Sequence, residues 1–156
     1  LPQIETPLGI ATIESWDCSN IEFSGIGFGS ADYCASTGGD MGKASLAYGR
    51  GKIINAAALY NTLALDGVWL DFRDPDGCRE ETLYVKTMGF KGRFAIHPDQ
   101  IKPIHDAYRP TTEELEWAKG VLEEAKTAGS GAFKYQGKMV DAPVLAVARL
   151  IISRED

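Results

Sequence analysis

The amino-acid sequence predicts an α/β fold of four strand–helix units, followed by a helix–hairpin–helix extension. Short apolar strands alternate with helices four times over residues 1–110, which is typical of a parallel sheet with covered faces. Residues 111–156 lose this alternation and form a second region. Four such units are about half of a TIM-type (β/α)8 barrel, which needs about 250 residues. An open doubly wound sheet is also compatible with the pattern alone.

The first two units lie before residue 66. Residues Gln3–Thr6 end a short strand, and Pro7 opens a helix over Leu8–Trp16 at a position where no N–H is needed. Residues Phe23–Gly29 alternate large and small side chains and predict a second buried strand. A polar, glycine-rich loop then precedes a helix over Ser45–Leu65, whose apolar residues recur at helical spacing.

The third and fourth units follow the same order. A strand is predicted over Gly67–Phe72, followed by turn residues and a helix over Arg79–Met88. Residues Arg93–His97 predict the fourth strand, which Pro98 ends, and Asp99–Tyr108 predict an amphipathic helix. No Gly-x-Gly-x-x-Gly motif follows the first strand, which argues against a dinucleotide-binding site.

The extension has its own helix and turn signals. A helix over Thr111–Ala128 begins with a Thr-x-x-Glu capping box. Residues 132–140 predict a hairpin that turns at Gln136-Gly137, and Asp141 caps a last helix over Pro143–Ile151. Several apolar side chains of this region have no evident partner in the strand–helix pattern, which predicts docking on a neighbouring subunit; they are Phe133, Tyr135, Met139, Val144 and Leu145.

The composition is that of a globular domain. The 156 residues carry 16 basic and 22 acidic side chains, a net charge of −6, and 44% are hydrophobic. This hydrophobic content excludes an intrinsically disordered chain, and the apolar runs are too short for a transmembrane helix. The acidic balance and the lack of a basic cluster argue against nucleic acid as the main partner. Three scattered cysteines form neither a disulfide framework nor a Cys-x-x-Cys pair and favour a reducing, cytoplasmic compartment.

The sequence opens within a predicted strand, without a Met or a signal-like segment. We therefore expect it to be the second half of a longer protein. An intact mass near 16.9 kDa would mean that only this half is present, and we would then expect no catalysis.

Four polar side chains follow the predicted strands, at the edge where parallel α/β folds place their reactive groups. They are Glu5, Asp32, Asp71 and His97. If the first two strands are neighbours, Glu5 and Asp32 converge on one hard cation, because Mg²⁺ often takes one or two carboxylates while water and substrate fill its other positions. The alternative is that each carboxylate caps the helix that follows it.

Four motifs occur in an order that resembles one family of enzymes. They are Ile4-Glu5-Thr6-Pro7-Leu8-Gly9, Gly29-Ser30-Ala31-Asp32-Tyr33-Cys34-Ala35-Ser36, Ile96-His97-Pro98-Asp99-Gln100-Ile101 and Gly137-Lys138-Met139-Val140-Asp141-Ala142-Pro143. Together they resemble the citrate lyase β-subunit-like CoA-ester lyases of the HpcH/HpaI aldolase superfamily, which include malyl-CoA and citramalyl-CoA lyases. The resemblance runs over residues 4–151, matches the second half of that family, and implies a (β/α)8 barrel with a C-terminal helical extension.

The resemblance implies roles for three carboxylates. The family's Mg²⁺ ligands, which can also bind Mn²⁺, fall on Glu5 and Asp32. Its catalytic acid falls on Asp141, in a segment that closes a neighbouring subunit's active site; the alternative role for Asp141 is a helix N-cap. An arginine that the family places near its first strands would precede Leu1, so this sequence does not contain it.

Other residues are weaker candidates for substrate binding. The backbone N–H groups of Ser30 and Ala31 are candidates for holding a substrate carboxylate. Asp71 either lines the substrate pocket or pairs with the nearby Arg73, and His97 either contacts substrate or closes the end of its strand with a local hydrogen bond.

The resemblance implies a Mg²⁺-dependent lyase that cleaves a β-hydroxyacyl-CoA of the malyl, citramalyl or citryl type to an acyl-CoA and a 2-keto acid, or runs the reverse condensation. Asp141 would exchange a proton with the acyl α-carbon. Two alternatives remain: an acyl-CoA thioester hydrolase on the same metal site, and a β subunit that works only with an acyl-carrier protein. The family also implies a homo-oligomer, a trimer or hexamer, in the cytoplasm or, in a eukaryote, the mitochondrial matrix.

Overall fold

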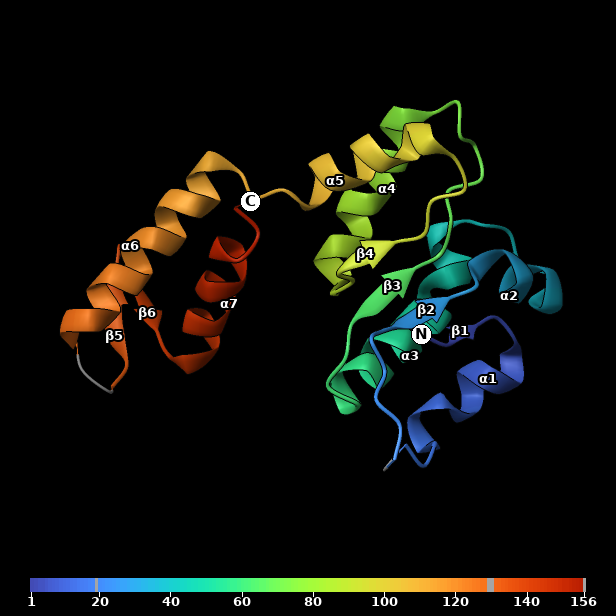
Figure 1. Cartoon of the computed structure of the whole chain (residues 1–156), viewed down its shortest axis with the longest axis horizontal. Coiled ribbons are helices and arrows are strands. Elements are labelled where there is room, and N and C mark those ends of the chain that lie inside the picture. The colour runs from blue at the N-terminus through green and yellow to red at the C-terminus, as the bar shows by residue number, and fades with distance from the viewer. Residues whose placement is uncertain (19, 129–130, 156) are drawn as a thin grey trace. The chain divides into compact units, whose positions relative to one another are not determined.

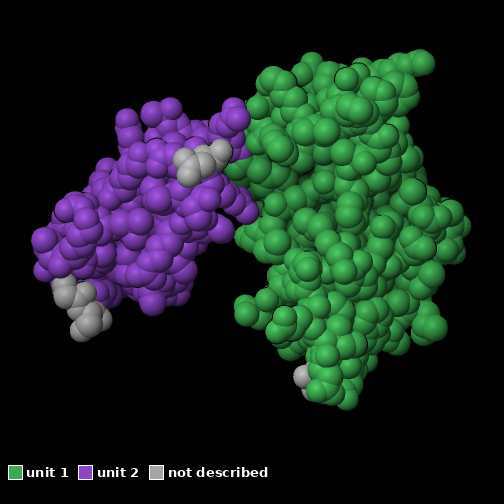
Figure 2. Space-filling view, viewed as in Figure 1, with its two compact units in different colours: residues 1–108 green, residues 109–156 purple. Residues whose placement is uncertain are grey.

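The computed structural model describes residues 1–18, 20–128 and 131–155. It divides the chain into two compact units, which Figure 2 colours separately: unit 1 covers Leu1–Tyr108 and unit 2 covers Arg109–Asp156. Within the described residues no helix is both long enough and apolar enough to cross a bilayer.

Unit 1 is built on a parallel sheet of four short strands (Figure 1). They are β1 (Gln3–Ile4), β2 (Ile26–Phe28), β3 (Ala64–Asp66) and β4 (Gly92–Arg93), and they lie side by side in chain order. Every neighbouring pair is parallel. The predicted α/β class is therefore confirmed.

Helices connect the strands and cover the sheet. They are α1 (Pro7–Thr12), α2 (Ser30–Thr37), α3 (Lys43–Leu59), α4 (Pro75–Met88) and α5 (Ile101–Tyr108), with 3₁₀ turns at Ile13–Ser15 and Pro98–Gln100. The longest, α3, packs on β2 and β3. Side chains of α1 to α4 share one hydrophobic core with the strands, with Ile26, Phe28, Ile53 and Val85 among its fully buried members.

The strand order distinguishes the two architectures that the sequence left open. Parallel crossovers are almost always right-handed, so connections that always move to the next strand in one direction place their helices on one face. A doubly wound sheet needs a reversal of strand order, at which its helices change face. The order β1-β2-β3-β4 has no reversal, which matches the wall of a barrel.

Several elements of unit 1 differ from the sequence prediction. The fourth strand, β4, covers only Gly92–Arg93, so most of the strand predicted over Arg93–His97 is wrong, and α4 begins at Pro75 instead of Arg79. The strand predicted at Gly67–Phe72 is wrong, because β3 lies at Ala64–Asp66 and the later residues form the loop before α4. The preceding helix ends at Leu59 instead of Leu65. The sequence did not predict this strand because a charged residue, Asp66, ends it. A carboxylate can be buried at this position because Arg50 and Arg93 both pair with it.

The sequence prediction also missed α2. Its segment follows β2 directly, where the sequence analysis predicts no helix before the polar, glycine-rich loop. The helix forms from Ser30 to Thr37 and ends at Gly38, whose φ of 73° is a left-handed conformation that glycine adopts readily.

Unit 2 consists of α6 (Thr112–Ala128), a hairpin of β5 (Phe133–Tyr135) and β6 (Lys138–Val140), and α7 (Ala142–Ile152). The expected capping box is confirmed: the Thr111 N–H donates to Glu114 Oε2 at 2.8 Å, and the Glu114 N–H donates to Thr111 Oγ1 at 3.1 Å. The hairpin turns at Gln136 and Gly137, both with positive φ, as predicted.

The apolar side chains of unit 2 correct one argument from the sequence. Phe133, Tyr135, Val144 and Leu145 are partly buried against the unit's own core of Ala118, Val121, Val140 and Ala148, so they do have a partner. Only Met139 of the five remains largely exposed, at 68%. The presence of these apolar residues is therefore no evidence of subunit docking.

Candidate functional site

The carboxyl ends of β1 and β2 bring Glu5 close to the start of α2. The Gly29 N–H donates to the Ile4 carbonyl at 2.8 Å, which holds the two strand ends together. Glu5 lies over Gly29: a Cβ added there would fall 2.4 Å from Glu5 Cβ and 2.9 Å from Glu5 Oε2. The glycine therefore provides the space that the Glu5 side chain occupies.

The first turn of α2 adds a second carboxylate and backbone N–H donors to this edge. Asp32 lies in that turn and is exposed, as is Glu5. Gly29 precedes the helix as its N-cap, and within the described part of the chain no side-chain cap hydrogen bond is found there. The backbone N–H groups of Ser30 and Ala31 belong to this uncapped turn. The side chain of Ser30 is buried.

This donor set has the chemistry of a site for a hard cation. One exposed carboxylate follows β1 and the other lies in the helix turn that follows β2, which leaves room for water and substrate, as Mg²⁺ requires. Among the residues that the structure describes, no group of three or more His, Cys, Asp or Glu side chains is placed to hold a metal. A site made of Glu5 and Asp32 would therefore rely on substrate and water for its remaining ligands.

The other two strand-end candidates take part in local contacts. Asp71 lies in the loop after β3, where its Oδ1 accepts a hydrogen bond from the Arg73 backbone N–H at 3.0 Å. His97 Nδ1 accepts from the Asp99 N–H at 3.2 Å, and its ring stacks on Phe72 with centroids 4.7 Å apart. The His97 contact is the local hydrogen bond that the sequence analysis gave as its structural alternative. Asp71 contacts the backbone of Arg73 instead of its side chain, and it also lines the cavity described below.

Asp141 is the N-cap of α7. Its Oδ1 accepts a hydrogen bond from the Val144 N–H at 3.3 Å, and the residue is half-buried. The capping role expected from the sequence is therefore confirmed, while its catalytic role stays a prediction.

A buried network of charged side chains lies beneath the carboxyl edge, and sequence reasoning missed it. Asp66, with no exposed surface, accepts from Arg50 Nε at 3.1 Å, from Arg50 Nη2 at 3.0 Å and from Arg93 Nη2 at 2.7 Å. Glu81 Oε1 lies 2.8 Å from Arg50 Nη2. Burial disfavours the charged guanidinium, but Asp66 and Glu81 outweigh this and raise the pKa of Arg50 above its ordinary value.

Arg93 extends this network to the backbone of the next loop. Its Nε donates to the Gly67 carbonyl at 3.0 Å, and its Nη1 donates to Thr82 Oγ1 at 3.2 Å. Gln100, also buried, joins the loops after β3 and β4: its Nε2 donates to the Trp69 carbonyl and its Oε1 accepts from the Ile96 N–H. The sequence offers no local signal for these contacts, since the partners lie far apart along the chain.

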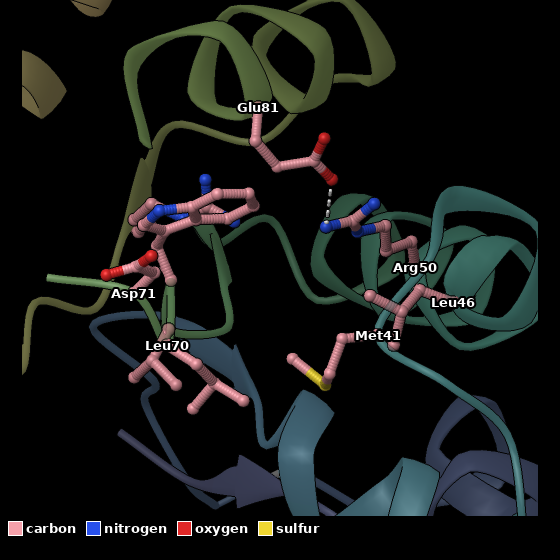
Figure 3. A pocket seen from close by; sticks show the side chains of 9 residues that line it. Met41, Leu46, Arg50, Leu70, Asp71 and Glu81 are labelled. Carbon is pink, nitrogen blue, oxygen red and sulfur yellow. Dashed lines mark ion pairs between the residues drawn. The ribbon is translucent and has the colours of Figure 1, made fainter. Parts of the chain in front are cut away.

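A cavity of about 220 Å³ lies beside the network. Figure 3 shows Arg50 and Glu81 facing each other at one side of it, with Met41 and Leu70 across from them. Most of its lining is apolar, and its charged side chains form ion pairs or backbone contacts. Among the described residues, Arg50 Nη1 and Trp69 Nε1 are buried in this lining without a hydrogen-bond partner. The exposed edge carries the two carboxylates, Glu5 and Asp32, and is our candidate for the metal site.

Comparisons with known proteins agree on one family. The model of the HpcH/HpaI aldolase/citrate lyase family matches residues 1–98. A second family model, described as a C–C bond lyase of the TIM-barrel fold, matches residues 51–155.

Individual relatives match almost all of the chain. It is 32% identical to the mitochondrial citramalyl-CoA lyase of Rattus norvegicus over 98% of its length, and 34% identical to the citrate lyase subunit beta of Escherichia coli K12 over its whole length. These matches cover 49% and 53% of the two relatives, so the chain spans about half the length of the curated relatives it matches.

The fold also matches a solved structure. CitE from Mycobacterium tuberculosis, in complex with magnesium, acetoacetate and coenzyme A, superposes with a TM-score of 0.83 at 33% identity. The match covers 98% of this chain and 59% of CitE.

Proposed function

Because the chain belongs to the HpcH/HpaI aldolase/citrate lyase family, we propose that it supplies the metal-binding half of a Mg²⁺-dependent C–C lyase for CoA thioesters. The substrate class is a β-hydroxyacyl-CoA of the malyl, citramalyl or citryl type, cleaved to an acyl-CoA and a 2-keto acid, or formed from them. The observation that carries the proposal is the position of Glu5 over Gly29, next to the uncapped helix turn that bears Asp32.

Glu5 and Asp32 are the residues that would hold the metal. When bound there, Mg²⁺ would supply Lewis-acid stabilisation for the keto-acid oxygens, whose charge changes as the C–C bond breaks. The N–H groups of Ser30 and Ala31, at the positive end of α2, would hold the keto-acid carboxylate. Asp71 and His97 are weaker candidates for substrate contact, at the rim of the same edge.

Asp141 is our candidate for the proton carrier. Its carboxyl group would donate a proton to the acyl-CoA α-carbon in cleavage and accept it in condensation. We propose that it acts in the site of a neighbouring subunit, within a trimer or a hexamer, and that residues 111–156 are the segment that reaches across. The cytoplasm, or a mitochondrial matrix in a eukaryote, is the proposed compartment; the rat relative is named mitochondrial.

Calorimetric titration with Mg²⁺ tests the metal site directly. Glu5→Gln and Asp32→Asn replace an anionic oxygen with a neutral one, and we expect each to weaken Mg²⁺ binding by about tenfold or more. Glu80→Gln is the matched control, because Glu80 is an exposed carboxylate on α4, outside the proposed site. Unchanged binding in both site variants would remove the two-carboxylate site.

Product analysis then separates the reaction types. Incubation of the full-length protein, which includes the other half of the proposed enzyme, with citramalyl-CoA and Mg²⁺ should release an acyl-CoA and a 2-keto acid in equal amounts. Release of free CoA in place of acyl-CoA would identify a thioester hydrolase. Turnover that begins only when an acyl-carrier protein is added would identify a dependent β subunit.

A further inference from the structure

The backbone of Gly67 lies close to the candidate site, although Gly67 is not part of β1 or β2. It follows β3 directly and lies against Ser30, the first residue of α2. A Cβ added at Gly67 would fall 1.9 Å from Ser30 Oγ, 2.7 Å from Ser30 Cβ and 3.0 Å from the Phe28 carbonyl oxygen. The start of α2 therefore rests on a backbone surface that only glycine leaves free.

The requirement at Gly67 is for space and not for backbone conformation. The glycines with positive φ in the described part of the chain are Gly38, Gly89 and Gly137, and Gly67 is not among them. An alanine can therefore adopt the backbone conformation found at this position, and its methyl group would act only by displacing its neighbours.

The buried network fixes Gly67 from the other side. Arg93 Nε donates to the Gly67 carbonyl at 3.0 Å, and Asp66 holds the same guanidinium through its Nη2 at 2.7 Å. The side chains of Arg93 and Asp66 are 1% and 0% exposed. Gly67 is thus joined to β4 by a hydrogen bond whose donor, Arg93, is held in place by a buried ion pair with Asp66.

We propose that Gly67 is a positioning residue: it sets the position of the first turn of α2 relative to Glu5. That turn carries Asp32 and the backbone N–H groups of Ser30 and Ala31. This inference rests on the proposed function for its effect on metal binding. The chain of contacts runs from Arg93 to Gly67 to Ser30, and then along α2 to Asp32. The buried charges therefore act on the exposed carboxylates without touching metal or substrate.

The Ser30 hydroxyl can rotate away from a methyl group at Gly67, but Ser30 Cβ, at 2.7 Å, cannot. Real Cβ contacts under 3.0 Å are essentially absent from proteins, so the start of α2 must shift by at least a few tenths of an ångström. Binding and catalytic groups must be held within about 0.5 Å of their productive positions, so a shift of this size matters for such a site. We expect Gly67→Ala to weaken Mg²⁺ binding by about tenfold or more, with the carboxylates themselves unchanged.

The experiment compares three variants of the whole chain. Gly67→Ala introduces the clash, and Gly51→Ala is the matched control, because a Cβ at Gly51 meets nothing within 4 Å. Gly67→Ala with Ser30→Gly removes both Ser30 atoms that the new methyl group would meet, and leaves only the Phe28 carbonyl contact at 3.0 Å. The readouts are the amide NMR shifts of Asp32 and Tyr33 in metal-free protein, which are not adjacent to the substituted residue 30, and the Mg²⁺ affinity by calorimetry.

We expect Gly67→Ala to shift the amide resonances of Asp32 and Tyr33 and to weaken Mg²⁺ binding. Gly51→Ala should change neither, and the double variant should recover both. Unshifted resonances in Gly67→Ala, or a double variant no better than the single one, would overturn the inference. So would loss of folding in both Gly67 variants, because the clash with Ser30 would then not explain the defect.

The two readouts distinguish this inference from the proposed function. If the unchanged chain binds no Mg²⁺, the proposed metal site fails. The amide shifts and their recovery in the double variant still decide whether Gly67 positions α2.

Discussion

Replacing Asp66 with asparagine removes the one negative charge that two buried arginines share. The carboxylate accepts three hydrogen bonds, two from Arg50 and one from Arg93, and all three side chains are at most 2% exposed. In Asp66→Asn the shape is kept and the charge is lost. Arg50 retains Glu81, while Arg93 retains only its neutral acceptors, the Gly67 carbonyl and Thr82 Oγ1.

The magnitude follows from this geometry. Breaking a buried ion pair by removing one partner costs about 3–5 kcal/mol, because it leaves an uncompensated charge in a medium of low dielectric constant. A domain of this size is stable by only about 5–15 kcal/mol, so the change removes a large share of the total. With a urea dependence of about 2 kcal/mol per M, a loss of about 4 kcal/mol lowers the unfolding midpoint by about 2 M.

Tryptophan fluorescence in urea measures this loss. A Trp117→Phe background leaves Trp16 and Trp69 as the reporters, and both lie in unit 1 with Asp66. Lys102→Ala is the control, because it breaks a surface ion pair: Lys102 pairs with Asp106, and its side chain is 83% exposed. Such pairs contribute about 0.5 kcal/mol or less. A loss below about 1 kcal/mol in Asp66→Asn would refute the claim that this carboxylate holds the two arginines.

Three further outcomes follow from the structure. Asp141→Asn keeps the cap of α7, so the free energy of unfolding should fall by less than about 1 kcal/mol. The lyase rate should fall by about 10²-fold or more, because the proton carrier is lost. Near-full turnover would show that Asp141 acts only as a cap. Hydrogen bonds from Ser45 and the Gly42 N–H lower the pKa of Asp40. The ionised Asp40 stabilises the fold above the pKa of the unfolded state, and this effect is lost as pH falls through the lower pKa of the folded state. The urea midpoint of Asp40→Asn should therefore fall less steeply with pH below about pH 4 than that of the unchanged protein. Midpoints that fall in parallel for both proteins would contradict this. Burial raises the thiol pKa of Cys34 and of Cys78. Both thiols should therefore react with a chromogenic disulfide at pH 8 only at the rate of local or global unfolding. Modification within seconds in the native state would show that the thiols are accessible.

The elements with strong local signals could be predicted from the sequence. The capping box at Thr111, the turn at Gln136-Gly137 and the cap at Asp141 each depend on residues within four positions of one another, and the structure has all three. The alternation of strands and helices likewise identified the α/β class. The strand at Ala64–Asp66 was missed because a charged residue ends it, and short apolar runs do not distinguish a strand from a helix end.

The candidate site was predictable only in part. Glu5 and Asp32 were identified from their places after successive strands, and the parallel pairing of β1 with β2 brings those strand ends together. Asp71 and His97 were identified in the same way, but each is engaged by a local backbone contact. Position after a strand fixes the edge on which a side chain lies, and it does not fix the partner that the side chain finds.

The sequence by itself determined the α/β class, the helix caps, the hairpin turn and the carboxylates at the sheet edge, because these depend on periodicity and on neighbours within a few residues. Only the tertiary structure decided that Asp66 joins Arg50, sixteen residues before it, to Arg93, twenty-seven residues after it. It also decided that Gly67 rests on Ser30. Those contacts depend on strand order and register, which bring distant residues within a few ångströms, and no local pattern of residues encodes that distance.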